Sequence, residues 1–136
     1  MTDKNNKVIV AVDDSSVVLM TLDKILSEHG FEVKGFSKGM RALKYLKTEV
    51  PDLIILDIEM PEINGFEMLE MIKEKEELVN VPVIFLTSNN QHADVVNAIK
   101  GGVKEYILKP IKEELLLEKV NSILGIKKEK LSWDNI

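Results

Sequence analysis

The residues with the most evident chemistry are acids that follow short apolar segments. Asp57 ends "LIILD", where four branched apolar residues precede it, and Asp13-Asp14 follow "VIVAV". A block of Leu and Ile of this length is typical of a strand buried on both faces, as in parallel sheets. An ionised carboxylate at the end of such a strand is costly unless it is solvated or paired. Asp57 is therefore either a strand-exit residue that reaches water or a residue whose charge is used.

Two other polar residues follow apolar segments in the same way, Thr87 after "VPVIFL" and Lys109 after "KEYIL". If the fold gathers these strand ends, three carboxylates meet beside a hydroxyl and an ammonium group. Carboxylates 4 Å apart repel by about 4 kcal/mol per pair at an effective dielectric constant near 20. A hard divalent ion with oxygen ligands, Mg²⁺ above all, relieves that repulsion. The set predicts a phosphoryl site with a carboxylate nucleophile, a metal, a Lys clamp and a Thr donor.

The hydrophobic pattern alternates between strands and helices along the whole chain. Short apolar runs predict strands at 7–12, 31–36, 52–56, 81–86 and 104–109. Helical spacing predicts helices at 15–30, 38–49, 65–78, 90–100 and 110–124. Ser15 or Ser16 is the expected cap of the first helix, and Asn64 with Glu67 resembles a capping box.

This alternation predicts an α/β fold made of βαβ units with right-handed crossovers. We expect a doubly wound, flavodoxin-like (βα)5 fold, with a five-stranded parallel sheet in the order 2-1-3-4-5. In open α/β sheets, ligands bind beyond the carboxyl ends of the strands where the strand order reverses. In this order strands one and three are neighbours at that point, which brings the three acids together.

Composition excludes several classes of protein. The 136 residues predict one domain, and 18 Lys+Arg against 23 Asp+Glu give a net charge of −5. This balance argues against direct nucleic-acid binding through a broad basic surface. The absence of cysteine excludes disulfides and thiolate chemistry. The N-terminus has no apolar signal core and no apolar stretch is long enough for a membrane span, so we expect a cytoplasmic protein.

Four motifs in order resemble those of the response-regulator receiver domain, the CheY-like family. They are "VDDSS" (12–16), "LDIEMPEINGFEML" (56–69), "LTS" (86–88) and "YILKPI" (106–111). The resemblance covers about residues 6 to 124 and implies a single-domain receiver in residues 1–124, with 125–136 as a C-terminal tail or linker stub. It implies a role in two-component signal transduction as a phosphoacceptor that is not a conventional enzyme.

The resemblance also implies the ligands and the phosphoacceptor. Asp57 would accept the phosphoryl group from a sensor histidine kinase or a histidine phosphotransfer protein. Asp14 and Asp57 would bind Mg²⁺ together with the backbone carbonyl of Glu59, and Asp13 would bind it through water. Lys109 would contact the phosphoryl group, and its bond to Pro110 would be cis as in the family.

The switch residues implied by the resemblance are Thr87 and Tyr106. Thr87 would move to a phosphoryl oxygen and Tyr106 would turn inward behind it. The face made by the fourth helix, fifth strand and fifth helix would then change its preference for a downstream protein partner. The expected assembly is a monomer or a phosphorylation-dependent dimer.

Each residue alone also has a plainer interpretation. Asp13 or Asp14 caps the first helix equally well, Thr87 is a common strand residue, and Tyr106 is a common packed aromatic.

Glu59 and Asn89, each two residues beyond a site residue, are hypothesised to tune the lifetime of the acyl phosphate.

Three other functions compete with a receiver that acts alone. The chain is alternatively a receiver cut from a larger transcription factor or output enzyme. A hydrolase with an aspartyl-phosphate intermediate would have Asp at position 59, where this chain has Glu59. A flavodoxin-like FMN binder is disfavoured because the acidic "DDSS" loop would repel a phosphate in the absence of a metal.

Overall fold

The computed structural model of the protein describes residues 5–89 and 102–126, and all structural statements below concern these residues. The strands are β1 (Val8–Val12), β2 (Glu32–Phe36), β3 (Leu53–Asp57), β4 (Val83–Thr87) and β5 (Glu105–Leu108). The helices are α1 (Ser16–Glu28), α2 (Gly39–Leu46), α3 (Gly65–Glu74) and α5 (Glu113–Leu124). The helix predicted at 90–100 lies outside the described residues.

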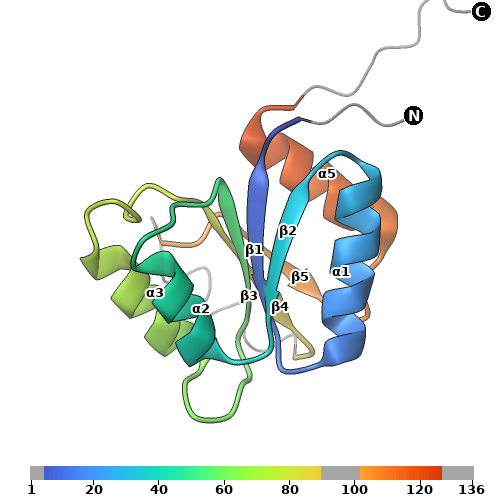
Figure 1. Ribbon diagram of the computed structural model, residues 1–136. Helices are drawn as coiled ribbons and strands as arrows, with labels where there is room; N and C mark the ends of the chain where they lie inside the picture. Colours follow the sequence, from blue (N-terminus) through green and yellow to red (C-terminus); the bar gives the residue numbers. More distant parts are fainter. Residues whose placement is uncertain (1–4, 90–101, 127–136) are drawn as a thin grey trace, which may run out of the picture.

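The five strands are all parallel and form one sheet in the order β2-β1-β3-β4-β5. Helices α2 and α3 cover one face, and α1 and α5 cover the other (Figure 1). The strand order reverses between β1 and β3, which are neighbours. The predicted flavodoxin-like fold is confirmed.

Side chains of the inner strands alternate between two cores. In β1, Val10 belongs to the core under α2 and α3, whereas Ile9 and Ala11 belong to the core under α1 and α5. In β3, Ile54 and Ile55 divide in the same way. Because both faces of an inner strand are covered, its sequence is continuously apolar, and this is the pattern that marked β3 as a parallel strand.

Local signals fix where the helices begin and end. Ser15 caps α1, since its side chain accepts a hydrogen bond from the Val18 N–H. Asn64 and Glu67 form both hydrogen bonds of the predicted capping box at the start of α3. Helix α5 ends at Gly125, which has the left-handed φ of 69° that glycine adopts without strain. Asp13 and Asp14 therefore do not cap α1, which corrects that alternative.

Several predicted boundaries differ from the structure. Strand β3 begins and ends one residue later than expected, so Asp57 is part of the strand, paired with Leu86 of β4. Helices α2 and α3 are shorter than predicted, and α3 ends because Lys75 has an extended backbone. Helix α5 begins at Glu113 rather than Pro110, since its cap Lys112 is extended and Ile111 packs against the core under α1 and α5.

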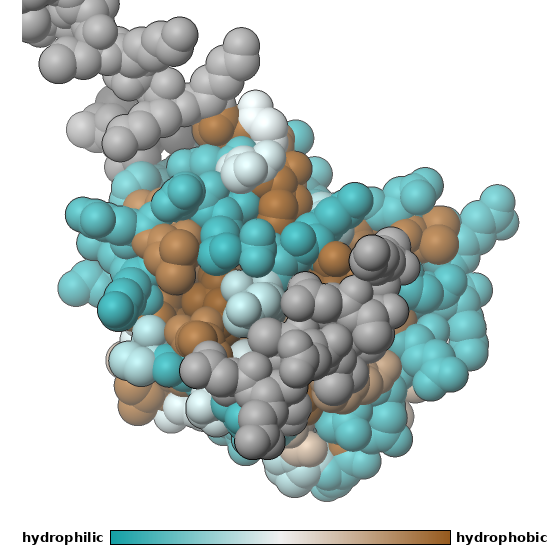
Figure 2. All heavy atoms as spheres, turned by 180° about the vertical axis from the view of Figure 1, so that it is seen from behind, coloured by the Kyte–Doolittle hydropathy of each residue, from teal (hydrophilic) through white to brown (hydrophobic). Residues whose placement is uncertain are grey.

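The outer surface is mixed. Figure 2 shows hydrophobic areas interrupted by hydrophilic side chains on the face seen from behind. Among the described residues, no helix is both long and apolar enough to span a membrane.

Candidate functional site

The site lies at the carboxyl ends of β1 and β3. Asp13 and Asp14 directly follow β1, and Asp57 is the last residue of the neighbouring β3. One carboxylate oxygen from each of the three acids lies within 4.8 Å of the other two. The strand order therefore brings together the acids that the sequence places at two separate strand ends.

Burial distinguishes the three acids. Asp57 and Asp13 are 1% and 0% exposed, whereas Asp14 is exposed. The alternative that Asp57 is an exit residue reaching water is therefore wrong. Buried carboxylates persist only with compensating charge and hydrogen bonds, so the groups around Asp57 and Asp13 decide what the site does.

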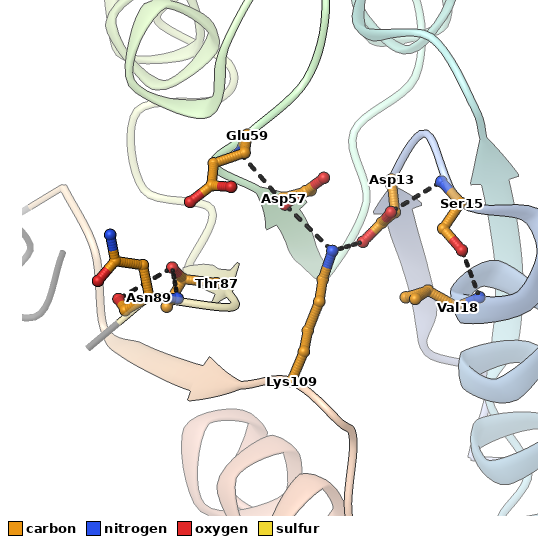
Figure 3. A network of polar contacts seen from close by, with 8 residues as sticks. All are labelled: Asp13, Ser15, Val18, Asp57, Glu59, Thr87, Asn89 and Lys109. Atoms are coloured by element: carbon orange, nitrogen blue, oxygen red, sulfur yellow. Dashed lines mark hydrogen bonds and ion pairs between the residues drawn. The ribbon is translucent and has the colours of Figure 1, made fainter. Parts of the chain in front are cut away.

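Lys109 bridges the two buried acids (Figure 3). Its Nζ lies 2.8 Å from Asp13 Oδ2 and 3.3 Å from Asp57 Oδ1. Lys109 follows β5, which is two strands away from β3, so the long side chain is what allows the ammonium group to reach the acids. The peptide bond between Lys109 and Pro110 is cis, as the resemblance implied.

Backbone amides also donate hydrogen bonds to both buried carboxylates. The Glu59 N–H donates to Asp57 Oδ1 at 3.2 Å, and the Ser15 N–H donates to Asp13 Oδ1 at 2.9 Å. Ser15 in turn caps α1, so the orientation of Asp13 is tied to the first turn of the helix. These contacts fix both carboxylates before any ligand binds.

Electrostatics in the site oppose ionisation of Asp57. Burial and, to a smaller extent, the Asp13 charge raise its pKa, Lys109 and the Glu59 N–H partly offset them, and the net pKa is about 6. Burial of Lys109 disfavours its charged form, but its contacts with Asp13 and Asp57 outweigh burial and raise its pKa. The ammonium group therefore stays charged, whereas the environment of Asp57 disfavours its charged form.

The donor set fits a hard divalent ion. Asp57 Oδ2 is fully buried and has no hydrogen-bond partner in the structure of residues 5–89 and 102–126. Within the same residues, three carboxylates face one ammonium group, which leaves excess negative charge. All the side-chain donors are carboxylate oxygens, the ligands that Mg²⁺ prefers. Asp13, Asp14 and Asp57 therefore fit Mg²⁺ in charge and ligand type.

Thr87 also lies at the carboxyl end of its strand, but its side chain forms hydrogen bonds with the nearby residue Asn89. It is buried at the end of β4, its hydroxyl accepts from the Asn89 N–H at 3.0 Å, and it donates to the Asn89 carbonyl at 3.2 Å. Tyr106 is half-buried in β5, in register with Phe85. Its ring packs against the core under α2 and α3. The structure thus places both predicted switch residues on the two strands beyond β3.

Gly65 has a role that sequence reasoning missed. An added Cβ at this position would lie 2.7 Å from the Asp57 carbonyl oxygen and 2.8 Å from Ile58 Cα. Glycine therefore lets the start of α3 approach the end of β3. The available signal was a glycine directly after the capping residue Asn64.

Comparison with known proteins decides the family. Residues 9–121 match the sequence profile of the response regulator receiver domain. The chain belongs to this family. As a receiver, it is 34% identical over 117 residues to the protein PilH of Pseudomonas aeruginosa, a match that covers 86% of this chain and 97% of PilH.

Two further relatives agree with this assignment. The receiver is 32% identical to the polar-differentiation response regulator DivK of Brucella ovis, over 88% of this chain and 97% of DivK. It is 26% identical to the receiver domain of the sensor histidine kinase PA1611 from Pseudomonas aeruginosa, with a TM-score of 0.79. That match covers 88% of this chain and 98% of the other, whose crystal structure has a magnesium ion coordinated in its active-site cleft.

Proposed function

We propose that this receiver accepts a phosphoryl group on Asp57 from the phosphohistidine of a sensor histidine kinase or a histidine phosphotransfer protein. The observation that carries the proposal is the geometry around Asp57. The Asp57 carboxylate is buried, and burial and Asp13 destabilise its charged form. It lies 3.3 Å from the Lys109 ammonium group, at the carboxyl ends of the strands, where ligands bind in open α/β sheets.

In the transfer step, a carboxylate oxygen of Asp57 attacks phosphorus. The bond between phosphorus and the histidine nitrogen breaks, and the imidazole leaves with that electron pair. Lys109 is placed to pair with the negative charge on the phosphoryl oxygens. The Glu59 N–H holds one Asp57 oxygen at 3.2 Å, which orients the nucleophile.

Magnesium would be held by Asp14 and Asp57, with Asp13 through water and the backbone carbonyl of Glu59. When bound, Mg²⁺ supplies positive charge that offsets the three carboxylates and the incoming phosphoryl oxygens. Lys109 already pairs with Asp13 and Asp57 at 2.8 and 3.3 Å, so the chain itself provides part of this compensation.

Phosphorylation would act on partners through Thr87 and Tyr106. The Thr87 hydroxyl would exchange its contacts with Asn89 for a phosphoryl oxygen, and Tyr106 on the adjacent β5 would turn inward. The surface that changes would be that of β5, α5 and the helix expected at 90–100, which lies outside the described residues. The partner would be a downstream protein. The receiver would bind it as a monomer or as a phosphorylation-dependent dimer.

The chain would be a phosphoacceptor rather than a conventional enzyme. A hydrolase would release phosphate over many turnovers and needs a general acid. At the position where such a hydrolase has Asp, this sequence has Glu59.

We further propose that residues 1–124 form the receiver unit, that 125–136 form a tail, and that the protein acts in the cytoplasm. The match to PilH and to DivK covers 97% of the length of each, so it takes in nearly the whole of both relatives.

Binding of beryllofluoride, which mimics an acyl phosphate, tests the proposal. We expect Mg²⁺-dependent binding that shifts the NMR signals of Thr87 and Tyr106. The Asp57→Asn variant is expected to show no shift at either residue. Equal shifts in wild type and Asp57→Asn would contradict Asp57 as the acceptor.

A further inference from the structure

A second concave surface lies beside β2, on the free edge of the sheet. It is a hollow of about 660 Å³ between the end of β2 and helix α2. We call it the basic hollow and define it by the side chains used below: Phe36, Lys38, Arg41, Lys44 and Tyr45. Its volume is within the range of about 300–1,000 Å³ that small-molecule sites occupy.

The cations of the basic hollow are exposed and unpaired. In residues 5–89 and 102–126, no carboxylate forms an ion pair with Lys38, Arg41 or Lys44. Three cations line this one hollow, although the chain as a whole has a net charge of −5. Other surface cations show the contrast, since Lys34 pairs with Glu32 at 3.3 Å and Lys119 pairs with Glu105 at 3.0 Å. The three cations of the hollow therefore carry positive charge that no ion pair within the described residues offsets.

Two aromatic rings line the same hollow. The ring centroids of Phe36 and Tyr45 are 5.3 Å apart, with the planes tilted by 47°. Both residues are half-buried, so each also contributes to the surface of the hollow. An aromatic face suits a planar ring, whereas a guanidinium fork and ammonium groups suit phosphate oxygens. The two kinds of side chain together favour a ligand that carries both groups.

We propose that the basic hollow binds a nucleoside phosphate. The phosphates would contact Lys38, Arg41 and Lys44, and the base would lie against Phe36 and Tyr45. This site is separate from the acid cluster, because it is built from β2 and α2 rather than from the ends of β1, β3 and β5. It does not depend on phosphorylation of Asp57.

Other anions fit the basic hollow less well. An acidic segment of a partner protein would match the three cations but would leave the two rings without a planar group. A nucleic-acid polymer would extend past the hollow onto a chain with excess negative charge. A free nucleotide matches the charge, the rings and the volume at once.

Titration of the ¹⁵N-labelled protein with ADP, followed by NMR, tests the proposal. EDTA is present throughout, because a divalent ion would carry nucleotide to the acid cluster. We expect saturable shifts in residues 35–45, with adenosine and pyrophosphate each binding at least about tenfold more weakly than ADP, since each retains half of the contacts.

Variants separate the two kinds of contact. Arg41→Gln is expected to lower the affinity for ADP by about tenfold or more. The control is Lys24→Gln, which removes an exposed charge from α1 on the opposite face of the sheet and should leave ADP affinity unchanged. Tyr45→Leu removes the ring and is expected to lower the affinity for ADP but not for pyrophosphate. Tyr45→Phe keeps the ring and should keep the affinity for ADP. Both Tyr45 variants are first checked for a folded spectrum, and Arg41→Gln, at an exposed position, carries the test if Tyr45→Leu fails to fold.

Four outcomes would overturn the proposal. Pyrophosphate binding as tightly as ADP would reduce the hollow to a simple anion site. An oligo-aspartate peptide binding more tightly than ADP would point to an acidic protein partner. Shifts confined to residues outside 35–45, or no saturable binding at millimolar ADP, would remove the site altogether.

Discussion

At the scale of the residue, the protein maintains an unfavourable charge. Asp57 could be replaced by an apolar residue that continues β3, yet the chain has a carboxylate with a pKa raised to about 6 by burial and Asp13. Lys109 offsets only part of this cost. A buried acid that destabilises the fold is expected where its charge is needed for binding or chemistry.

Asp57→Asn is therefore expected to stabilise the protein at pH 7.5 in EDTA. Since the folded pKa of Asp57 is about 6 and its unfolded value is 3.8, stability is lost as the pH rises from about 3.8 to about 6, where only the unfolded state is ionised. The gain should be about 1–3 kcal/mol at pH 7.5, should shrink as the pH falls from about 6 to 3.8, and should vanish well below pH 3.8, where the carboxyl is protonated in both states.

Urea unfolding of both proteins across this pH range measures the difference. Asp14→Asn is the matched control, because it removes one exposed charge from the same cluster and should give a smaller gain. A stability difference between wild type and Asp57→Asn that is constant from pH 4 to 7.5 would contradict the role assigned to burial.

Glu59 is expected to set how long the acyl phosphate lasts. Its side chain is exposed and lies two residues past Asp57, at the lip of the site, where a carboxylate affects approach of water and anions. Glu59→Asn removes that charge and keeps the backbone N–H that orients Asp57. We expect the rate of phosphoryl loss to change about threefold or more, measured by timing the decay of the phosphorylated protein. Equal decay rates would refute the hypothesis.

At the scale of the element, the site depends on how closely α3 approaches β3. The capping box of Asn64 and Glu67 fixes where α3 starts, and Gly65 permits contact with the Asp57 backbone. The sequence predicted the capping box because that signal is local. It did not predict the close approach, because the clash would involve backbone atoms of Asp57 and Ile58, and their distance from Gly65 is set by how α3 packs on the sheet.

Gly65→Ala is expected to destabilise the fold by about 2–3 kcal/mol, because the new Cβ meets backbone atoms at 2.7 and 2.8 Å that cannot rotate away. It should also slow phosphorylation by displacing Asp57. Gly35→Ala is the matched control, since its Cβ would meet only Leu19 side-chain atoms at 3.7 Å or more, and should change stability by less than about 1 kcal/mol. Urea unfolding measures both, and equal effects would contradict the close-approach argument.

At the scale of the whole molecule, the sequence predicted the sheet better than the site. Continuous apolar runs mark β3 and β4 because both faces are covered, and the spacing of strands and helices fixes a parallel sheet. The acids at the ends of β1 and β3 could be grouped from the strand order alone. The bridge from Lys109 to Asp13 could not, because it depends on β5, β1 and the length of one side chain together.

The ends of the strands and helices were also hard to predict, because they too depend on contacts between elements. Asp57 looked like a residue beyond its strand because it is charged, but pairing with β4 continues through it. Pro110 looked like the start of a helix because proline favours the first turn, but packing of Ile111 delays α5 to Glu113. In both cases tertiary contacts overrode a local preference.

The most direct test of the account is intact mass spectrometry after incubation with acetyl phosphate, with and without Mg²⁺, on wild type and Asp57→Ala. The account predicts one added phosphoryl group on wild type, dependent on Mg²⁺ and absent from Asp57→Ala. An adduct of equal extent on Asp57→Ala would contradict Asp57 as the phosphoacceptor, and an adduct that forms equally well in EDTA would contradict the role given to the three acids.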